Sequence, residues 1–301
     1  MPKWKLRKPK PRHQPRLKRK RVVDTRPATR AQVFYLQKLA VLGFATEGQW
    51  ARFAGRAAGA VHHARRRLEV KRLICVARGY ADELFPGTQS PRVPVMLHAL
   101  TEAGRRLAEA STALGPISAP IVRRWVAGSR VARHVDRNIA LTEALIAVDR
   151  CARPWRLVSV LRDDSSLAGA TGTACTAIGP VRPPLVLRLA DTEDQSTLTV
   201  LVEVEGRDFT HAQRAAVEAR FEQYAEILRA PPEGMGRVAL LYVKRFGGRG
   251  GDPQIVMKAR DLLACCAVVQ ARDLHRIDSF SIFGCTLCSG KSSSRAPMET
   301  E

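Results

Sequence analysis

The chain has 301 residues, 45% of them hydrophobic, and a formal net charge of +22, with a sequence pI near 10.7. No apolar run approaches the ~20 residues of a membrane-spanning helix, so we expect no membrane partner, and the seven scattered cysteines are expected to be reduced cytoplasmic thiols. A charge of this size favours a polyanionic partner, and we expect a soluble protein of two domains that associates with the nucleoid.

Residues 1–28 are predicted to form a disordered basic arm. Residues 1–30 contain thirteen Lys and Arg and one acid, Asp24, so about +12 of the net charge lies in one tenth of the chain. Such a segment cannot bury enough apolar surface to fold alone. It is either a solubilising tail or an arm that lies on DNA phosphates, where each cation releases a condensed counterion. The candidate contacts in the arm are Lys18, Arg19, Lys20 and Arg21.

The segment 29–112 has the element order of a winged helix-turn-helix domain. A first helix is expected over 29–42 and ends at Gly43. Thr46 then opens a second helix in a capping box with Gln49, because each of the two side chains satisfies a free backbone amide at the helix start.

A third helix, over 57–68, follows a break at Gly55. Its apolar residues recur at spacings of four, three and four, which places them on one stripe; they are Ala57, Val61, Ala64 and Leu68. Two β-like runs, 72–76 and 95–100, predict a hairpin that would form the wing. Thr101 is expected to cap a last helix that runs to about residue 112.

Outside its apolar stripe the third helix is basic. A helix of this width fits the major groove of double-stranded DNA, and arginine pairs bidentately with guanine, so we expect this helix to read base pairs. The alternative is a solvated helix face, which the further cations of the hairpin and the arm disfavour. The candidate DNA-binding residues of this domain are Arg56, His62, Arg65, Arg66, Arg67, Lys71, Arg72, Arg78 and Arg92.

In the second half, residues 113–130 are expected to be a linker, residues 131–284 an α/β domain and residues 285–301 a flexible tail. Helices and strands alternate in the α/β domain, which is typical of a mixed sheet with flanking helices. The expected strands are 155–161, 184–189, 197–205, 237–244 and 277–283, of which the second and third form a hairpin. The expected helices are 131–148, 209–228 and 253–270.

Three short patterns accompany this order of elements. They are the turn Leu100-Thr101-x-x-Gly104, the strand end Glu203-Val204-Glu205, and Tyr224 on the helix that follows. The chain thereby resembles the replication-relaxation family of plasmids and integrative elements over most of residues 30–284. The resemblance implies an α+β or α/β fold class, with a winged helix-turn-helix domain followed by a restriction-endonuclease-like domain of the PD-(D/E)xK type. In that pattern Pro-Asp opens one strand, Glu-x-Asp ends the next, and Lys stands four residues before Tyr.

The chain departs from this pattern where the chemistry depends on it. Pro184 takes the place of the aspartate and Arg220 that of the lysine, while Glu203 and Glu205 alone offer too few oxygen ligands for a divalent cation. Glu143 is a candidate for a relocated third acid. We therefore expect a nuclease-like scaffold without catalysis, metal or cofactor. Convergence of the three glutamates would favour an active nuclease instead.

Two functions remain open. The first is a non-catalytic DNA-binding protein of a plasmid or other mobile element that acts in replication, relaxation, mobilisation or their regulation, with replication or mobilisation proteins as further candidate partners. The second is a metal-dependent nuclease that uses Glu143, Glu203, Glu205 and Arg220. Cys285 and Cys288 form half of a zinc site, and ordinary thiols are expected there.

Overall fold

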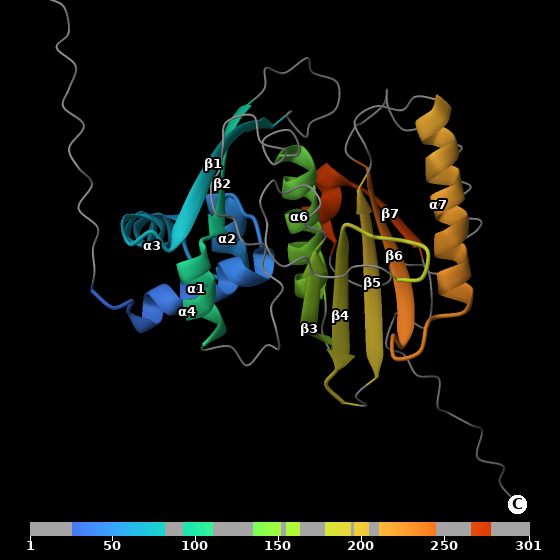
Figure 1. Ribbon diagram of the computed structural model, residues 1–301, viewed down its shortest axis with the longest axis horizontal. Helices are drawn as coiled ribbons and strands as arrows, with labels where there is room; N and C mark the ends of the chain where they lie inside the picture. Colours follow the sequence, from blue (N-terminus) through green and yellow to red (C-terminus); the bar gives the residue numbers. More distant parts are fainter. Residues whose placement is uncertain are drawn as a thin grey trace, which may run out of the picture.

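The computed structural model describes residues 26–81, 93–110, 135–151, 155–162, 178–193, 196–204, 211–244 and 266–277. These residues form six α-helices and two sheets in a mixed α and β architecture. Figure 1 shows the N-terminal helices and a long hairpin at one end, helix α6 (Val135–Cys151) in the middle, and the large sheet with helix α7 (His211–Arg229) at the other end. Among the described residues, no helix is long and apolar enough to cross a membrane. Most of the basic arm, the linker 113–130 and the tail 285–301 lie outside the described residues.

Three helices open the described chain: α1 (Arg30–Leu42), α2 (Glu47–Ala54) and α3 (Ala58–Val70). The predicted capping box between Thr46 and Gln49 is confirmed, since the hydroxyl of Thr46 accepts from the amide of Gln49 and the Gln49 side chain accepts in return. Thr29 and Gln32 form a second capping box at the start of α1. Both helix starts are therefore fixed by local hydrogen bonds.

The connection from α3 to the first strand contains a residue in an unusual conformation. Arg72 has a φ of 58°, the left-handed region, and the amides of Arg72 and Leu73 donate to the carbonyls of Glu69 and Leu68. This is the Schellman arrangement that ends many helices, usually with glycine in the left-handed position. The expectation of a strand from residue 72 was wrong by two residues, because this turn occupies the first two.

The hairpin consists of β1 (Ile74–Ala81) and β2 (Val93–Leu100), which pair antiparallel. Helix α4 (Glu102–Glu109) follows, capped by Thr101, whose hydroxyl accepts from the amide of Gly104. The same hydroxyl donates to the carbonyl of Arg72 at 2.7 Å. A Cβ atom on Gly104 would lie 1.9 Å from the carbonyl oxygen of Leu73. The turn Leu100-Thr101-x-x-Gly104 thus joins α4 to the end of α3 through contacts that only glycine permits.

Helix α6 (Val135–Cys151) is the central element of the molecule (Figure 1). It contacts α2 and β1 on one side and β5 and the 3-10 helix η2 (Ala271–Arg276) on the other. Its buried residues lie around most of its circumference rather than on one stripe, among them Ile139, Leu141, Leu145 and Val148. Since one hydrophobic cluster includes residues from α1, α2, α6 and the large sheet, the core is continuous between the two halves of the chain.

The large sheet has the strand order β3-β4-β5-β6-β7. Its strands are β3 (Trp155–Arg162), β4 (Leu185–Asp191), β5 (Thr197–Val204), β6 (Arg237–Lys244) and β7 (Cys266–Gln270). The predicted antiparallel hairpin of β4 and β5 is confirmed, and the remaining pairs make the sheet mixed. Strands β3, β5, β6 and β7 therefore end at the same edge of the sheet.

The expected helix 253–270 was wrong in its last five residues, which form β7. This short apolar run, Cys-Ala-Val-Val-Gln, pairs in parallel with β6, so tertiary pairing decides its conformation. Ile277, where a last strand was expected to begin, closes the 3-10 helix instead, and residues 278–283 lie outside the described part of the chain.

Helix α7 (His211–Arg229) covers the face of the sheet opposite to α6 (Figure 1). Its residues Phe221 and Tyr224 pack on Leu201 and Tyr242 of the sheet. Leu187 and Val200, which point to the other face, pack in the cluster that contains α6. Because neighbouring residues on a strand point to opposite faces, the sheet separates the two helices completely.

Candidate nucleic-acid interface

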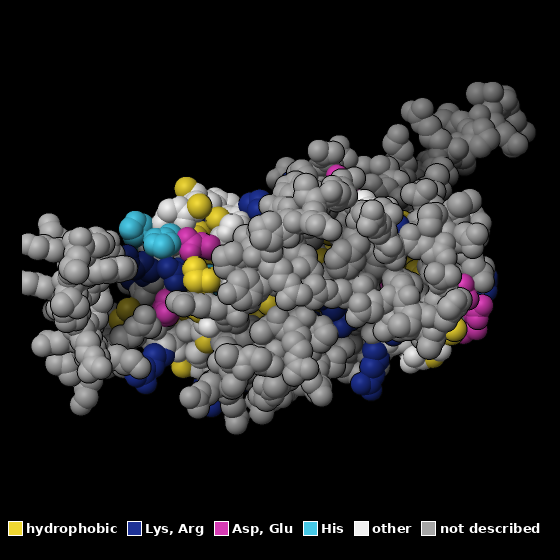
Figure 2. Space-filling view, turned by 90° about the horizontal axis from the view of Figure 1, so that it is seen from above, with side chains coloured by type: hydrophobic (Ala, Val, Ile, Leu, Met, Phe, Trp, Pro, Cys, Tyr) yellow, Lys and Arg dark blue, Asp and Glu magenta, His cyan; other side chains and the backbone are white. Residues whose placement is uncertain are grey.

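The exposed face of α3 is a single stripe of residues. Gly59, His63, Arg66 and Val70 are all exposed, and their spacing of four, three and four places them on one side of the helix. Arg66 and His63 have no hydrogen bond or ion pair with the rest of the described chain. Figure 2 shows histidine side chains at this end of the molecule, beside acidic and basic side chains. We call these four residues the outer stripe.

The flank of α3 that faces α2 is acidic, and a single arginine pairs with its two carboxylates. Arg65, expected to contact DNA, has a side chain that is only 11% exposed and lies between two carboxylates. Its Nε is 3.1 Å from Glu47 Oε2, and its Nη1 donates to Glu69 Oε2 at 3.1 Å. His62 Nδ1 lies 3.0 Å from Glu47 Oε1. The structure therefore directs Arg65 to internal carboxylates rather than to the outer stripe.

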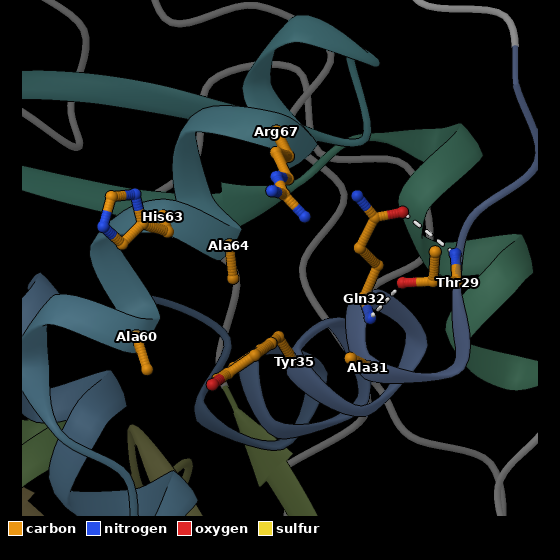
Figure 3. A pocket seen from close by; sticks show the side chains of 8 residues that line it. All are labelled: Thr29, Ala31, Gln32, Tyr35, Ala60, His63, Ala64 and Arg67. Carbon is orange, nitrogen blue, oxygen red and sulfur yellow. Dashed lines mark hydrogen bonds between the residues drawn. The ribbon is translucent and has the colours of Figure 1, made fainter.

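The flank that faces α1 carries a different set of groups. Here a hollow of about 390 Å³ lies between α1 and α3 (Figure 3). Its lining residues are Thr29, Ala31, Gln32, Tyr35, Ala60, His63, Ala64 and Arg67. None of them is acidic, and the Arg67 side chain makes no hydrogen bond or ion pair within the described chain.

The basic arm leaves the folded part of the chain next to this flank. Lys71, at the end of α3, donates from Nζ to the backbone carbonyl of Arg26, the first described residue. Arg26 and Arg30 are exposed, and the exposed Arg56 guanidinium lies 5.7 Å from the ring centroid of Phe34. The first described residue of the arm is therefore close to the C-terminal end of α3.

The hairpin is supported from one side by α6. Val95 and Leu97 of β2 pack against Val135 and Ile139 of α6, whereas Met96 is 44% exposed. Arg78, a predicted DNA contact, pairs with Met96 in the hairpin register, and its side chain lies outside the described set. Arg92 also lies outside the described residues.

His98 is a core residue beneath the interface. Its side chain is fully buried beside Trp50, with ring centroids 6.2 Å apart. Neither ring nitrogen has a hydrogen-bond partner in the described part of the chain. Burial, together with the nearby charge of Arg65, lowers the pKa of His98 to about 4. The imidazole is therefore neutral at pH 7, as its apolar surroundings require.

A second candidate site lies at the edge of the large sheet where β5 ends. The structure brings together three of the positions that match the PD-(D/E)xK pattern. Tyr224 donates from its hydroxyl to Glu203 Oε2 at 2.9 Å, and Arg220 Nη1 lies 3.3 Å from the same oxygen. Leu185 pairs with Val202, so Pro184 and Glu203 are adjacent at the same end of β4 and β5.

Glu203 is nearly buried, and its contacts are those of a structural carboxylate. Its side chain is 9% exposed, and one oxygen already receives both Tyr224 and Arg220. Burial and the adjacent carboxylate raise the pKa of Tyr224, so its hydroxyl remains a donor. Within the described residues, no group of three or more His, Cys, Asp and Glu side chains could hold a metal ion. Glu205 lies outside the described residues.

The third candidate acid is on the other side of the molecule. Glu143 accepts a hydrogen bond from Gln49 Nε2 at 3.1 Å and forms an ion pair with Arg52, both from α2. It belongs to α6, which packs on the face of the sheet opposite to α7 and Glu203. The structure therefore does not bring Glu143 and Glu203 together.

Sequence reasoning missed a buried arginine that joins the two halves. Arg162, at the end of β3, is 2% exposed and donates to the backbone carbonyls of Leu42 and Asn138. Its guanidinium lies 5.1 Å from the ring centroid of Phe44. Thr142 of α6 donates to the Phe44 carbonyl at 2.6 Å. An arginine inside an apolar strand is the one signal in the sequence that marks this position.

Comparisons with known proteins found no relative by sequence. No protein-family model and no curated protein matches the chain. Among solved structures, the restriction endonuclease FokI aligns with a TM-score of 0.28 and 10% sequence identity, over 84% of this chain and 44% of FokI. The chain thus spans less than half the length of FokI, and the likeness is too distant to assign a family.

Proposed function

We propose that the chain is a DNA-binding protein whose residues 29–112 form a winged helix-turn-helix domain that places α3 in the major groove. The observation that carries this proposal is the distribution of charge around α3. The outer stripe and the α1 flank carry Arg66 and Arg67, whose side chains have no ion pair within the described chain, whereas the acids lie on the α2 flank, where Arg65 pairs with them. An exposed helix with unpaired cations on one side is suited to a polyanionic groove.

The role we propose is that of the replication-relaxation family, in the replication, mobilisation or regulation of a plasmid or other mobile element. The convergence of Glu203, Arg220 and Tyr224 at one sheet edge supports this proposal, because the family pattern requires these positions to meet. We propose that residues 131–284 are a nuclease-like scaffold without catalysis. Pro184 offers no oxygen ligand from its side chain, and Glu203 is engaged by two donors, which leaves too few oxygens for Mg²⁺.

The proposed interface is tested by substituting two neighbouring arginines of α3. Arg66→Ala should leave the free energy of unfolding within about 0.5 kcal/mol of the parent and weaken binding by about 1–3 kcal/mol at particular base pairs. Arg65→Ala should instead lower the free energy of unfolding by about 1–3 kcal/mol, because it leaves Glu47 and Glu69 without their buried partner. Binding is measured by fluorescence anisotropy on a duplex selected from a random library, and unfolding by urea titration.

A matched control is Arg188→Ala, which removes one exposed arginine from β4. It should change neither stability nor sequence preference. Binding of the selected duplex by Arg66→Ala with the affinity of the parent would contradict the assignment of α3 as the reading helix. Metal-dependent nicking of supercoiled plasmid that disappears in Glu203→Ala would favour the nuclease alternative.

A further inference from the structure

We propose that the hollow between α1 and α3 binds a phosphodiester group of the DNA backbone, beside the groove that the outer stripe reads. The inference rests on the proposed function and adds to it a phosphate site on one flank of α3. The hollow has a volume of about 390 Å³, within the ~300–1,000 Å³ of ordinary ligand pockets, so it accommodates a phosphate together with part of its sugar.

Two of the polar groups that line the hollow are donors that face each other, the side-chain amide of Gln32 and the guanidinium of Arg67. The side-chain oxygen of Gln32 accepts from the backbone amide of Thr29 at 3.0 Å, which fixes the orientation of the amide and turns its Nε2 away from Thr29. Gln32 is 6% exposed as a whole residue and lines the hollow. Figure 3 shows Gln32 Nε2 and the guanidinium of Arg67 pointing toward one another across the gap.

Two donor groups that converge on a hollow without an acceptor between them are suited to a ligand that carries only acceptors. A guanidinium has five N–H donors and no acceptor, and a phosphate offers oxygens only. The hollow also has no acidic lining residue, while the exposed Arg30 and the end of α3 with Lys71 lie nearby. An anionic oxygen group is thus the ligand that satisfies both Gln32 and Arg67.

The position of the hollow favours DNA over a free anion. Its lining includes His63, which also belongs to the outer stripe. A duplex in contact with the outer stripe therefore brings its backbone to the hollow. The opposite flank does not offer an equivalent site, because Glu47 and Glu69 would repel a phosphate. The basic arm is excluded as the occupant of the hollow, because Arg67 would repel its positively charged side chains.

The test adds a charge to the hollow without disturbing the fold. Ala31 is exposed and lines the hollow in the first turn of α1, where an acid interacts favourably with the helix dipole. Ala31→Glu should therefore keep the melting temperature of the parent yet lower the affinity for every duplex by about tenfold, through repulsion of the phosphate. Ala31→Gln, of nearly the same size, should remain within about threefold of the parent.

Arg67 provides a second measurement. Arg67→Ala should weaken binding equally for all sequences and reduce the slope of log K against log salt by about 0.9, whereas Arg66→Ala should act on particular base pairs.

If Ala31→Glu binds duplex like Ala31→Gln while Arg66→Ala still loses sequence preference, the hollow is not a phosphate site and the proposed function stands. If Ala31→Glu keeps its duplex affinity but is no longer stabilised by inorganic phosphate in a melting assay that stabilises the parent, the hollow takes a free anion, and our inference is wrong. If the parent binds no duplex, both proposals fail.

Discussion

Arg65 and Arg66 are neighbours in the sequence, yet their surroundings differ completely. The guanidinium of Arg65 lies between Glu47 and Glu69, while Arg66 is exposed on the outer stripe. Glu69 stands four residues after Arg65, a spacing that the sequence displays. Glu47 comes from another helix, so its contact with Arg65 depends on how α2 packs against α3. The number of arginines on a helix therefore does not show how many are available to a ligand. The acidic residues on that helix and on the helices packed against it decide which arginines are already paired.

At the same scale, His98 should make stability depend on pH. The folded protein holds the pKa of His98 at about 4, below the ~6.5 of the unfolded chain. The unfolded chain therefore binds the proton more readily, and stability that is complete above pH 6.5 is lost as the pH falls toward 4. The loss is up to about 3 kcal/mol. His98→Leu should reduce this dependence, which urea titrations at pH 7 and pH 5 would reveal. An equal loss in the parent and the variant would contradict the assignment.

At the scale of elements, the end of α3, the start of β1 and the start of α4 meet in one place. Arg72 is in the left-handed conformation, and its backbone carbonyl accepts a hydrogen bond from the hydroxyl of Thr101. The amide of Thr101 donates to Leu73, whose carbonyl lies against Gly104. Helix α3, the β1–β2 hairpin and helix α4 are therefore held at fixed angles by a few backbone contacts.

Two glycine substitutions, one in this arrangement and one in α2, should change the free energy of unfolding in opposite directions. Gly104→Ala places a methyl group against the Leu73 carbonyl and should lower the free energy of unfolding by about 1–3 kcal/mol. At Gly48 in α2, an added methyl group would approach only the far end of the Arg52 side chain, at 3.9 Å. Gly48→Ala should raise the free energy of unfolding by up to about 1 kcal/mol, because alanine favours the helix. Thermal unfolding of the two variants beside the parent would check both signs. Tolerance of alanine at Gly104 would show that α4 can move away from β1.

The sequence predicted elements well where the signal is local. The capping box of Thr46 and Gln49 and the hairpin of β4 and β5 depend on residues close in the chain, and both are confirmed. The prediction of a helix over Cys266–Gln270 was wrong, because the strand with which this segment pairs lies more than twenty residues earlier in the chain. The cluster of Glu203, Arg220 and Tyr224 could be matched to a pattern, but its hydrogen bonds follow from the packing of α7 on the sheet. The hollow beside Arg67 had no signal in the sequence at all.

At the scale of the whole molecule, α6 belongs to both halves. It packs against α2 and β1 on one side and against β5 on the other, and the hydrophobic core runs through it without interruption. Gln49 and Arg52 of α2 bind Glu143 of α6, while Arg162 holds the corner between α1 and α2. We infer that the proposed domains 29–112 and 131–284 share one cooperative core.

This arrangement predicts a single unfolding transition. Trp50 is buried in the N-terminal helices and Trp155 in the first strand of the large sheet, so each reports on one half. Variants that keep only one of these two tryptophans should show the same urea midpoint by fluorescence, because neither half retains its core without α6. Isolated residues 29–112 should accordingly be less stable than the whole chain. Two midpoints separated by more than the experimental error would contradict a shared core.

In the proposed complex with DNA, the unequal flanks of α3 make its contacts with the two strands unequal. A helix can enter a major groove in two opposite directions that are nearly equivalent for a symmetric stretch of DNA. Here one side of the helix carries Glu47 and Glu69, and the other carries Arg67 and the origin of the basic arm. The sugar-phosphate backbone is equivalent in the two directions, so in either one the acidic side lies beside one strand and the basic side beside the other. In the proposed complex the two strands should therefore make unequal backbone contacts with the protein, while base contacts of the outer stripe decide the direction.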